Sequence, residues 1–162
     1  MSGEPVAFDA FFERESERLL RALYAITGSR TQAEDIAQDA FTKVFERWDS
    51  VSVMDDPAGY LHRTAMNLFR NEYRRAARAL KRLVTSTPAH DDVFAPVEDR
   101  DQASQVLALL TPRQRAALVL TEALGYSGEE AGDLLGIKAS TVYALTHQAR
   151  TTLSASVEVT DG

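Results

Sequence analysis

Apolar residues recur every three or four positions along most of the chain, which is the spacing of one face of an α-helix. The pattern predicts helices over residues 8–26, 31–48, 57–81, 102–110 and 111–124, and two more between residues 128 and 153. No segment alternates apolar and polar residues convincingly, as a half-buried strand would. We therefore expect an all-α fold.

Local start and stop signals support these bounds. Thr31 and Glu34 have the spacing of a capping box, Asp56-Pro57 is a favourable N-cap and first-turn pair, and Gly28 is expected to end the first helix. The residues predicted to face the core of the first half are Phe8, Phe12, Leu19, Leu23 and Ile26, then Ala33, Ile36, Ala37, Ala40, Phe41, Val44, Phe45 and Trp48, then Tyr60, Leu61, Thr64, Ala65, Leu68, Phe69 and Tyr73.

The segment 128–147, GEEAGDLLGIKASTVYALTH, has the internal spacing of a helix-turn-helix. The places where two crossed helices touch hold Ala131, Leu135, Ile137, Val142 and Leu145. Gly132 stands where a larger side chain would push the helices apart, and Gly136 where the chain must turn with a positive φ. Ser127 and Glu130 form a second capping box, and Ser140 is expected to cap the next helix. This pattern favours a helix-turn-helix over a helical hairpin that merely packs in a core.

Residues 84–101, VTSTPAHDDVFAPVEDRD, carry two prolines and many acids without periodicity, so they are expected to form an extended linker. The predicted organisation is a helical domain over 1–82, a flexible acidic linker over 83–101, a helix-turn-helix domain over 102–155 and a tail over 156–162.

The net charge of −6 argues against nucleic-acid binding, but its distribution argues for it. Residues 57–82 hold seven basic side chains and a single acid, whereas the rest of the chain is acidic. Six polar residues share one face of the helix predicted there: Arg63, Asn67, Arg70, Asn71, Arg74 and Arg78. Such a stripe is often only a solvated surface. The amides and nearby aromatic residues favour contact with nucleic acid, because these residue types bind phosphates, read base edges and stack on bases.

The sequence offers little for catalysis. Cysteine is absent, and the three histidines lie in three different segments without metal-ligand spacing. There is no Gly-rich phosphate loop and no pair of nucleophile and base. We expect no enzyme activity, no catalytic residue, no metal and no cofactor. The apolar runs are too short to span a membrane, so a cytoplasmic protein is the default expectation.

Three segments together resemble the extracytoplasmic-function sigma factors, the minimal sigma-70-type factors that keep only regions 2 and 4. AEDIAQDAFTKVFERW at 33–48 is similar to the family's core-binding helix, and DPAGYLHRTAMNLFRNEYRRAAR at 56–78 to its promoter-melting and minus-ten segment. Residues 110–150 resemble region 4. The resemblance implies a subunit of bacterial RNA polymerase that binds promoter DNA, and an anti-sigma partner is expected on the same ground.

The resemblance also implies roles for individual residues. Those expected to bind the clamp helices of the largest polymerase subunit are Asp35, Gln38, Asp39 and Phe41, with Phe41 shaping the helix from behind. Asn67 falls where the family reads a minus-ten base, loop 49–56 where it captures a flipped base, and the neighbouring arginines where it holds phosphates. The linker corresponds to the segment that threads the RNA exit channel.

The last helix departs from the family, because relatives carry several Arg and Lys residues there. The candidates for minus-35 contact are Lys138, Ser140, Thr141, Tyr143, His147 and Arg150. With so few cations, we expect weak minus-35 binding, or a region 4 that relies on region 2 and polymerase or turns toward a protein partner. The rival is a degenerate sigma-like protein that binds polymerase or an anti-sigma partner without selecting promoters. A response regulator would need strands and a phosphorylatable Asp pocket, and the first 80 residues offer neither.

Overall fold

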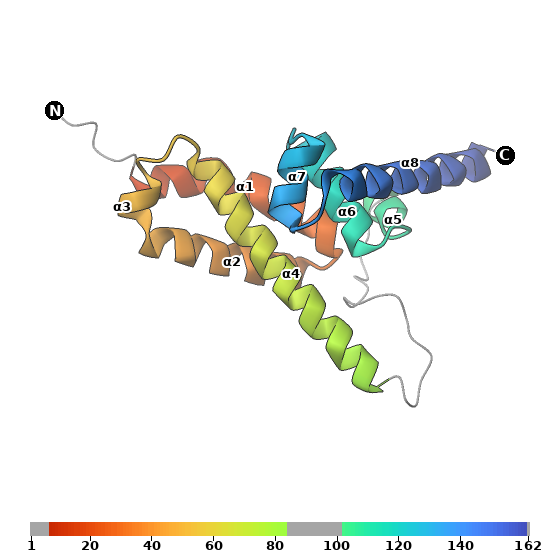
Figure 1. The fold of residues 1–162 in the computed structure, drawn as a ribbon, viewed down its shortest axis with the longest axis horizontal. Helices are drawn as coiled ribbons and strands as arrows, with labels where there is room; N and C mark the ends of the chain where they lie inside the picture. The colour runs from red at the N-terminus through yellow and green to blue at the C-terminus, as the bar shows by residue number, and fades with distance from the viewer. Residues whose placement is uncertain (1–6, 84–101, 162) are drawn as a thin grey trace.

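The computed structural model describes residues 7–83 and 102–161, and every regular element in these ranges is helical. The first half contains α1 (Phe8–Thr27), α2 (Arg30–Glu46), α3 (Trp48–Val51) and α4 (Pro57–Leu83). The second half contains α5 (Gln102–Leu107), α6 (Pro112–Leu118), the π-helical turn η1 (Val119–Ala123), α7 (Gly128–Leu135) and α8 (Ala139–Asp161). Figure 1 shows these elements in order along the chain. The all-α prediction is confirmed for the described residues. The predicted linker lies outside them, except Leu83, which ends α4.

Two of the predicted helix-end signals in the first half are observed, and one is not. Gly28 ends α1 with φ 71°, and the Asp56 carboxylate accepts a hydrogen bond from the Gly59 amide at 3.0 Å, as an N-cap should. The predicted Thr31–Glu34 capping box is wrong, because the Ser29 hydroxyl caps α2 through the Gln32 amide at 3.2 Å. Part of the predicted loop 49–56 is the short helix α3.

The core predictions for the first half need three corrections. Phe11 is fully buried whereas Phe12 is 44% exposed, although Leu19, Leu23 and Ile26 of the same predicted face are buried as expected. Phe45 is 61% exposed at the rim of the aromatic cluster, where its ring contacts Phe8. His62 and Met66 are buried although neither was predicted to be.

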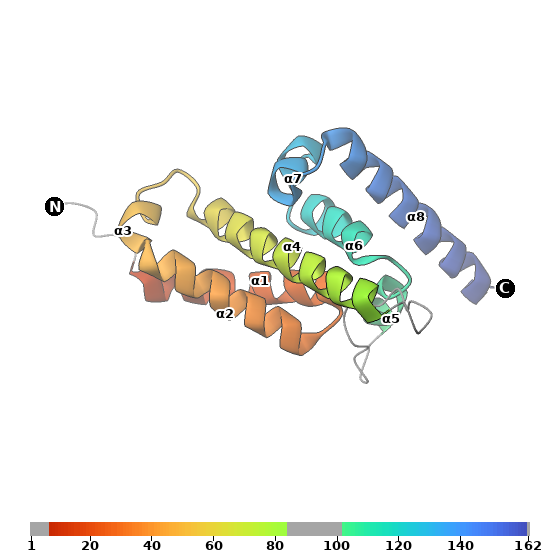
Figure 2. The same ribbon diagram turned by 60° about the horizontal axis from the view of Figure 1, so that its bottom comes forward.

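The burial of His62 and Met66 follows from the position of α4, which packs on α2 with one face and on α7 with another. In Figure 2, α4 runs between the α1–α2 pair and the helices of the second half. A helix buried on two sides has a wider apolar face than a helix at the edge of one bundle. The two halves therefore share one hydrophobic core, which also includes contacts of α1 with α6 and η1.

The helix-turn-helix forms as predicted from α7 and α8. Ser127 and Glu130 make the reciprocal capping box, and Gly136 has φ 69°. A Cβ on Gly132 would lie 2.7 Å from the Ile137 carbonyl oxygen, so a larger side chain would separate the two helices. Two details were wrong. Ser140 lies inside the first turn of α8, not at the preceding cap position, and α8 continues past Leu153 to Asp161.

Candidate nucleic-acid interface

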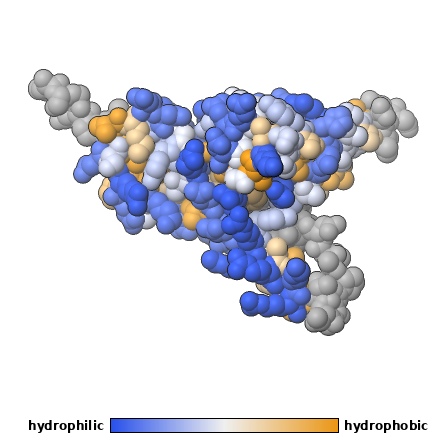
Figure 3. Space-filling view, in the orientation of Figure 1, coloured by the Kyte–Doolittle hydropathy of each residue, from blue (hydrophilic) through white to orange (hydrophobic). Residues whose placement is uncertain are grey.

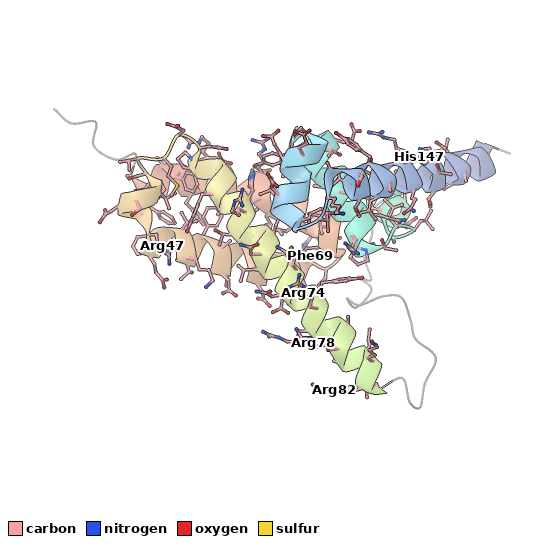
Figure 4. All side chains as sticks on the ribbon, in the orientation of Figure 1. Arg47, Phe69, Arg74, Arg78, Arg82 and His147 are labelled. Carbon is pink, nitrogen blue, oxygen red and sulfur yellow. The ribbon has the colours of Figure 1, made fainter. Side chains whose placement is uncertain are left out.

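The basic stripe of α4 is accessible to solvent. Five of its six members are exposed: Arg63, Asn67, Asn71, Arg74 and Arg78. Arg70 is half-buried, and its guanidinium donates to the Asn67 side-chain oxygen at 3.3 Å. Figure 4 shows Arg74, Arg78 and Arg82 along the half of α4 that extends away from the bundle, and Figure 3 shows this half as strongly hydrophilic. The exposed members of the stripe are therefore accessible to a nucleic-acid strand, whereas Arg70 is partly covered.

A hollow of about 400 Å³ lies between the end of α2 and the middle of α4. It is lined by Lys43, Glu46, Arg47, Tyr60, Thr64, Asn67, Leu68 and Asn71. Asn67 thus lines a space that combines two cations, one carboxylate, two amides and an aromatic ring. Cations, amides and aromatic rings are groups that bind a nucleotide. Figure 4 labels Arg47 where α2 ends and α3 begins.

Sequence reasoning missed Lys43, Arg47, Tyr60 and Thr64 as members of this site. Tyr60 and Thr64 were counted as core, yet both are only half-buried. Their spacing with Asn67 along α4 would have placed them on the border of the polar face. Arg47 comes from the turn between α2 and α3, and the packing of α2 on α4 brings it there.

A second hollow, of about 370 Å³, continues along α4 toward its C-terminus and is lined by Asn71, Arg75, Arg78, Ala79 and Arg82. Arg75 also forms an ion pair with Glu72 at 3.6 Å. The two hollows share Asn71 as a lining residue. Amides and an aromatic ring line the hollow nearer the N-terminus of α4, and arginines line the one nearer its C-terminus.

The residues predicted to bind polymerase divide into two groups. Asp35, Gln38 and Asp39 are exposed on α2, on the side opposite its buried face. Phe41 is 5% exposed, and its ring lies 4.7 Å from that of Phe12. Phe41 therefore supports the helix from the core side, as expected, and is shielded from direct contact with a partner.

The predicted contact residues lie in α8 or, for Lys138, just before it. All but one are exposed: Lys138, Ser140, Tyr143, His147 and Arg150, with Thr141 half-buried. The Tyr143 ring packs over Gly128, where a Cβ would lie 2.5 Å from the ring. Arg150 forms an ion pair with Glu122 of η1. Since a carboxylate already neutralises Arg150, the cationic character of this surface is even lower than the sequence indicates.

The second half covers part of the α4 surface. The helix-turn-helix turn at Gly136 lies against the Arg70 guanidinium, so closely that a Cβ there would collide with it. Arg115, only 3% exposed, donates through Nε to the Ile26 carbonyl at the end of α1 at 2.7 Å. These contacts fix how the two halves pack.

His62 of α4 and Tyr126, between η1 and α7, add a third contact between the halves, with His62 Nδ1 and Tyr126 Oη 2.6 Å apart. Burial lowers the pKa of His62, against the opposing effect of the Glu15 carboxylate. Burial raises the pKa of Tyr126. Both side chains are therefore held neutral near pH 7.

The described residues show neither a metal-type cluster nor a membrane span. Within residues 7–83 and 102–161, His, Asp and Glu side chains form no group of three that could hold a metal ion. Over the same ranges, no helix combines the length and apolar character needed to cross a membrane.

The chain matches two protein families over most of its length: sigma-70 region 2 over residues 11–79 and sigma-70 region 4 over residues 100–153. It is 30% identical to the RNA polymerase sigma-E factor of Streptomyces avermitilis, over 98% of this chain and 89% of that protein. It is 31% identical to the ECF RNA polymerase sigma factor SigE of Mycolicibacterium smegmatis, over 89% of this chain and 59% of that protein.

Two solved structures share the fold. The sigma factor RpoE of Bartonella quintana, in complex with the anti-sigma factor NepR, matches with a TM-score of 0.71 at 22% identity, over 94% of this chain and 97% of that one. CnrH, in complex with the cytosolic domain of CnrY, matches with a TM-score of 0.61 at 26% identity, over 98% of this chain and 92% of that one. Together with the exposed basic stripe and the helix-turn-helix, these matches show that the chain belongs to the extracytoplasmic-function sigma factors of the sigma-70 family.

Proposed function

We propose that this sigma factor docks on bacterial core RNA polymerase through α2 and selects promoters chiefly through α4. The observation that carries the proposal is the exposed row of arginines and amides on α4, with a nucleotide-sized hollow beside Asn67. As a subunit of polymerase, the chain would work in the bacterial cytoplasm. It would contribute binding energy and base selection while polymerase performs the chemistry.

On α4 the work is divided between arginines and amides. Arg63, Arg70, Arg74 and Arg78 hold the phosphates of the opened strand, a contact that is independent of sequence. Asn67 reads a minus-ten base, with Asn71 beside it. Capture of a flipped base costs a few kcal/mol of unstacking, which stacking and hydrogen bonds must offset. The hollow between α2 and α4 offers Tyr60 and Arg47 for this purpose, next to the predicted capture loop 49–56.

Docking on polymerase uses the polar face of α2. Asp35, Gln38 and Asp39 are exposed and on one face, so they can contact the clamp helices together. Phe41 keeps this face in place through its packing in the core. Replacing it would disturb docking indirectly, through the helix.

Region 4 makes a weaker contribution. Lys138, Ser140, Thr141, Tyr143 and His147 remain candidates for minus-35 contact at the start of α8. Arg150 adds little while Glu122 neutralises it. A surface with one fewer phosphate-binding cation releases about one fewer counterion when it binds DNA, so its affinity and its salt dependence are both lower. We propose that region 4 binds minus-35 DNA only when region 2 and polymerase hold the promoter nearby.

The packed arrangement must open for promoter binding, because the turn at Gly136 covers part of Arg70. One solved structure of similar fold contains the anti-sigma factor NepR, and another contains the cytosolic domain of CnrY. We propose that an anti-sigma protein also controls this chain.

Reconstituted transcription tests the proposal. The chain is added to bacterial core polymerase with a library of promoters randomised in the minus-ten region, and the transcripts are sequenced. Selective initiation from a narrow set of sequences is expected. Initiation without sequence preference, despite binding to polymerase, would instead favour the rival, a sigma-like protein that binds polymerase without selecting promoters.

A further inference from the structure

A third hollow, of about 340 Å³, lies between the two halves of the molecule. Arg70, Tyr73 and Arg74 line it from α4, and Arg113 lines it from the first turn of α6. The remaining wall is largely apolar and includes Leu145 of α8. Figure 4 shows Arg74 on α4 just beyond Phe69, another lining residue. The hollow exists because the two halves pack together, and neither half contains all of its arginines.

Within the described part of the chain, the three arginines of this hollow have no acidic partner. Among residues 7–83 and 102–161, no carboxylate forms an ion pair with Arg70, Arg74 or Arg113. Burial and the neighbouring Arg74 both lower the pKa of Arg70, which means that its positive charge is disfavoured as it stands. Other arginines at the surface are paired, such as Arg75 with Glu72 and Arg150 with Glu122. An anion would relieve the repulsion.

We propose that this hollow binds a nucleotide, with its phosphates on Arg70, Arg74 and Arg113 and its base against Tyr73 and the apolar wall. One guanidinium group can donate two parallel hydrogen bonds to the oxygens of a phosphate. Three guanidinium groups therefore fit a ligand with more than one phosphate. An aromatic ring and aliphatic side chains fit a planar base. The nucleotide joins the two halves in their packed arrangement and occupies two arginines of the basic stripe.

The size of the hollow favours a small molecule over a protein segment. Its volume falls at the lower end of the range for small-molecule sites, about 300–1,000 Å³. An acidic helix, about 10 Å across with its side chains, would not enter it. Free phosphate would fill only a fraction of it and would leave the apolar wall unused.

Isothermal titration calorimetry of the full chain, without DNA and without divalent metal, tests the binding. The probes are ATP, GTP, inorganic tripolyphosphate, adenosine and a glutamate-rich peptide. At least one nucleotide is expected to bind with one-to-one stoichiometry, about tenfold more tightly than tripolyphosphate, because base stacking adds to the phosphate contacts. Adenosine is expected not to bind. Failure of both nucleotides, binding of several per chain, or tighter binding of the peptide would overturn the proposal.

Two charge-matched variants separate a site from general attraction to arginine. Arg113→Gln is expected to weaken nucleotide binding about tenfold. Arg75→Gln removes the same charge one residue from Arg74, but Arg75 lines the neighbouring hollow, so a change of less than about twofold is expected. Equal losses in both variants would overturn the proposal. Because these measurements contain no DNA, they test nucleotide binding separately from promoter selection. Either proposal can fail while the other holds.

Thermal unfolding gives a second readout. Saturating nucleotide is expected to raise the Tm of the wild-type chain by a few degrees, since a ligand that binds only the folded form stabilises it. The same concentration should leave the Tm of Arg113→Gln nearly unchanged. An equal rise in both proteins would contradict binding at this hollow.

Discussion

His62 Nδ1 and Tyr126 Oη lie 2.6 Å apart although 64 positions separate the two residues in the chain. Their rings also meet edge to face, with centroids 5.8 Å apart. His62 belongs to α4, the helix that carries the basic stripe, and Tyr126 immediately precedes the capping box of the helix-turn-helix. This hydrogen bond therefore couples the packing of the second half to the helix that carries the basic stripe.

The stability of the packed form is expected to fall in mild acid. Burial is the main cause that lowers the pKa of His62 from 6.5. The Glu15 and Asp56 carboxylates act to raise this pKa, and the Arg18 guanidinium acts to lower it. The unfolded chain therefore binds a proton at His62 before the folded chain does. The contribution of neutral His62 to the stability of the folded chain is present above pH 6.5, and it is lost as the pH falls through the lowered pKa of His62. Thermal unfolding at pH 7.5 and pH 5.5 should give a larger drop in Tm for the wild type than for His62→Asn. Equal drops would contradict this role.

Tyr126→Phe is expected to destabilise the chain by about 1–3 kcal/mol, because it leaves a buried histidine without a hydrogen-bond partner. His62 Nε2 is already buried without a partner in the described structure, so the ring would then lack both. Urea unfolding measures the loss. Tyr24→Phe removes a hydroxyl from a half-buried tyrosine of α1 and serves as control, with a change below about 0.5 kcal/mol. Similar values for the two variants would argue against the hydrogen bond.

Arg115→Met is expected to be among the most damaging single changes, with a loss of about 2–4 kcal/mol. The buried guanidinium donates to the carbonyls of Ile26, Leu107 and Leu110, and methionine fills much of the volume while donating nothing. Arg113→Met, two residues away and exposed, should change the free energy of unfolding by less than about 0.5 kcal/mol. Comparable losses would show that Arg115 has no special role in joining the halves.

Glu122→Gln is expected to strengthen DNA binding by region 4, because it releases Arg150 from its ion pair. Fluorescence anisotropy with duplex DNA over a range of salt concentrations should show higher affinity and a salt slope steeper by about one counterion. Glu129→Gln removes an acid that has no ion pair with Arg150 and controls for net charge. If the two variants bind DNA with the same slope, Arg150 is not a phosphate contact.

The features predicted correctly from the sequence depend on local geometry. The Ser127–Glu130 capping box and the turn at Gly136 are set by residues within one or two helical turns, where spacing alone determines the structure. The basic stripe on α4 could be predicted for the same reason, since residues three or four apart share a helix face.

The errors arose where packing selects between neighbours. Phe11 and Phe12 are adjacent and equally apolar, and both rings contact Phe41 of α2, but only Phe11 is enclosed, with Trp48 also against its ring. His62 is buried where it meets Tyr126 of the second half, a contact that no periodicity within α4 could reveal. Met66 stands at helical spacing between His62 and Phe69, so its burial could have been predicted from that spacing. The hollow beside Asn67 was missed because packing creates it: Arg47 reaches it from the turn between α2 and α3.

The most direct test of the central claim compares Asn67→Ala with Arg74→Ala in transcription by reconstituted polymerase, using promoters randomised across the minus-ten region. If α4 reads the opened strand as proposed, Asn67→Ala changes which base is preferred at one position, whereas Arg74→Ala lowers initiation from all sequences alike and keeps the preference. Identical effects of the two substitutions, or no effect of either, would contradict the claim.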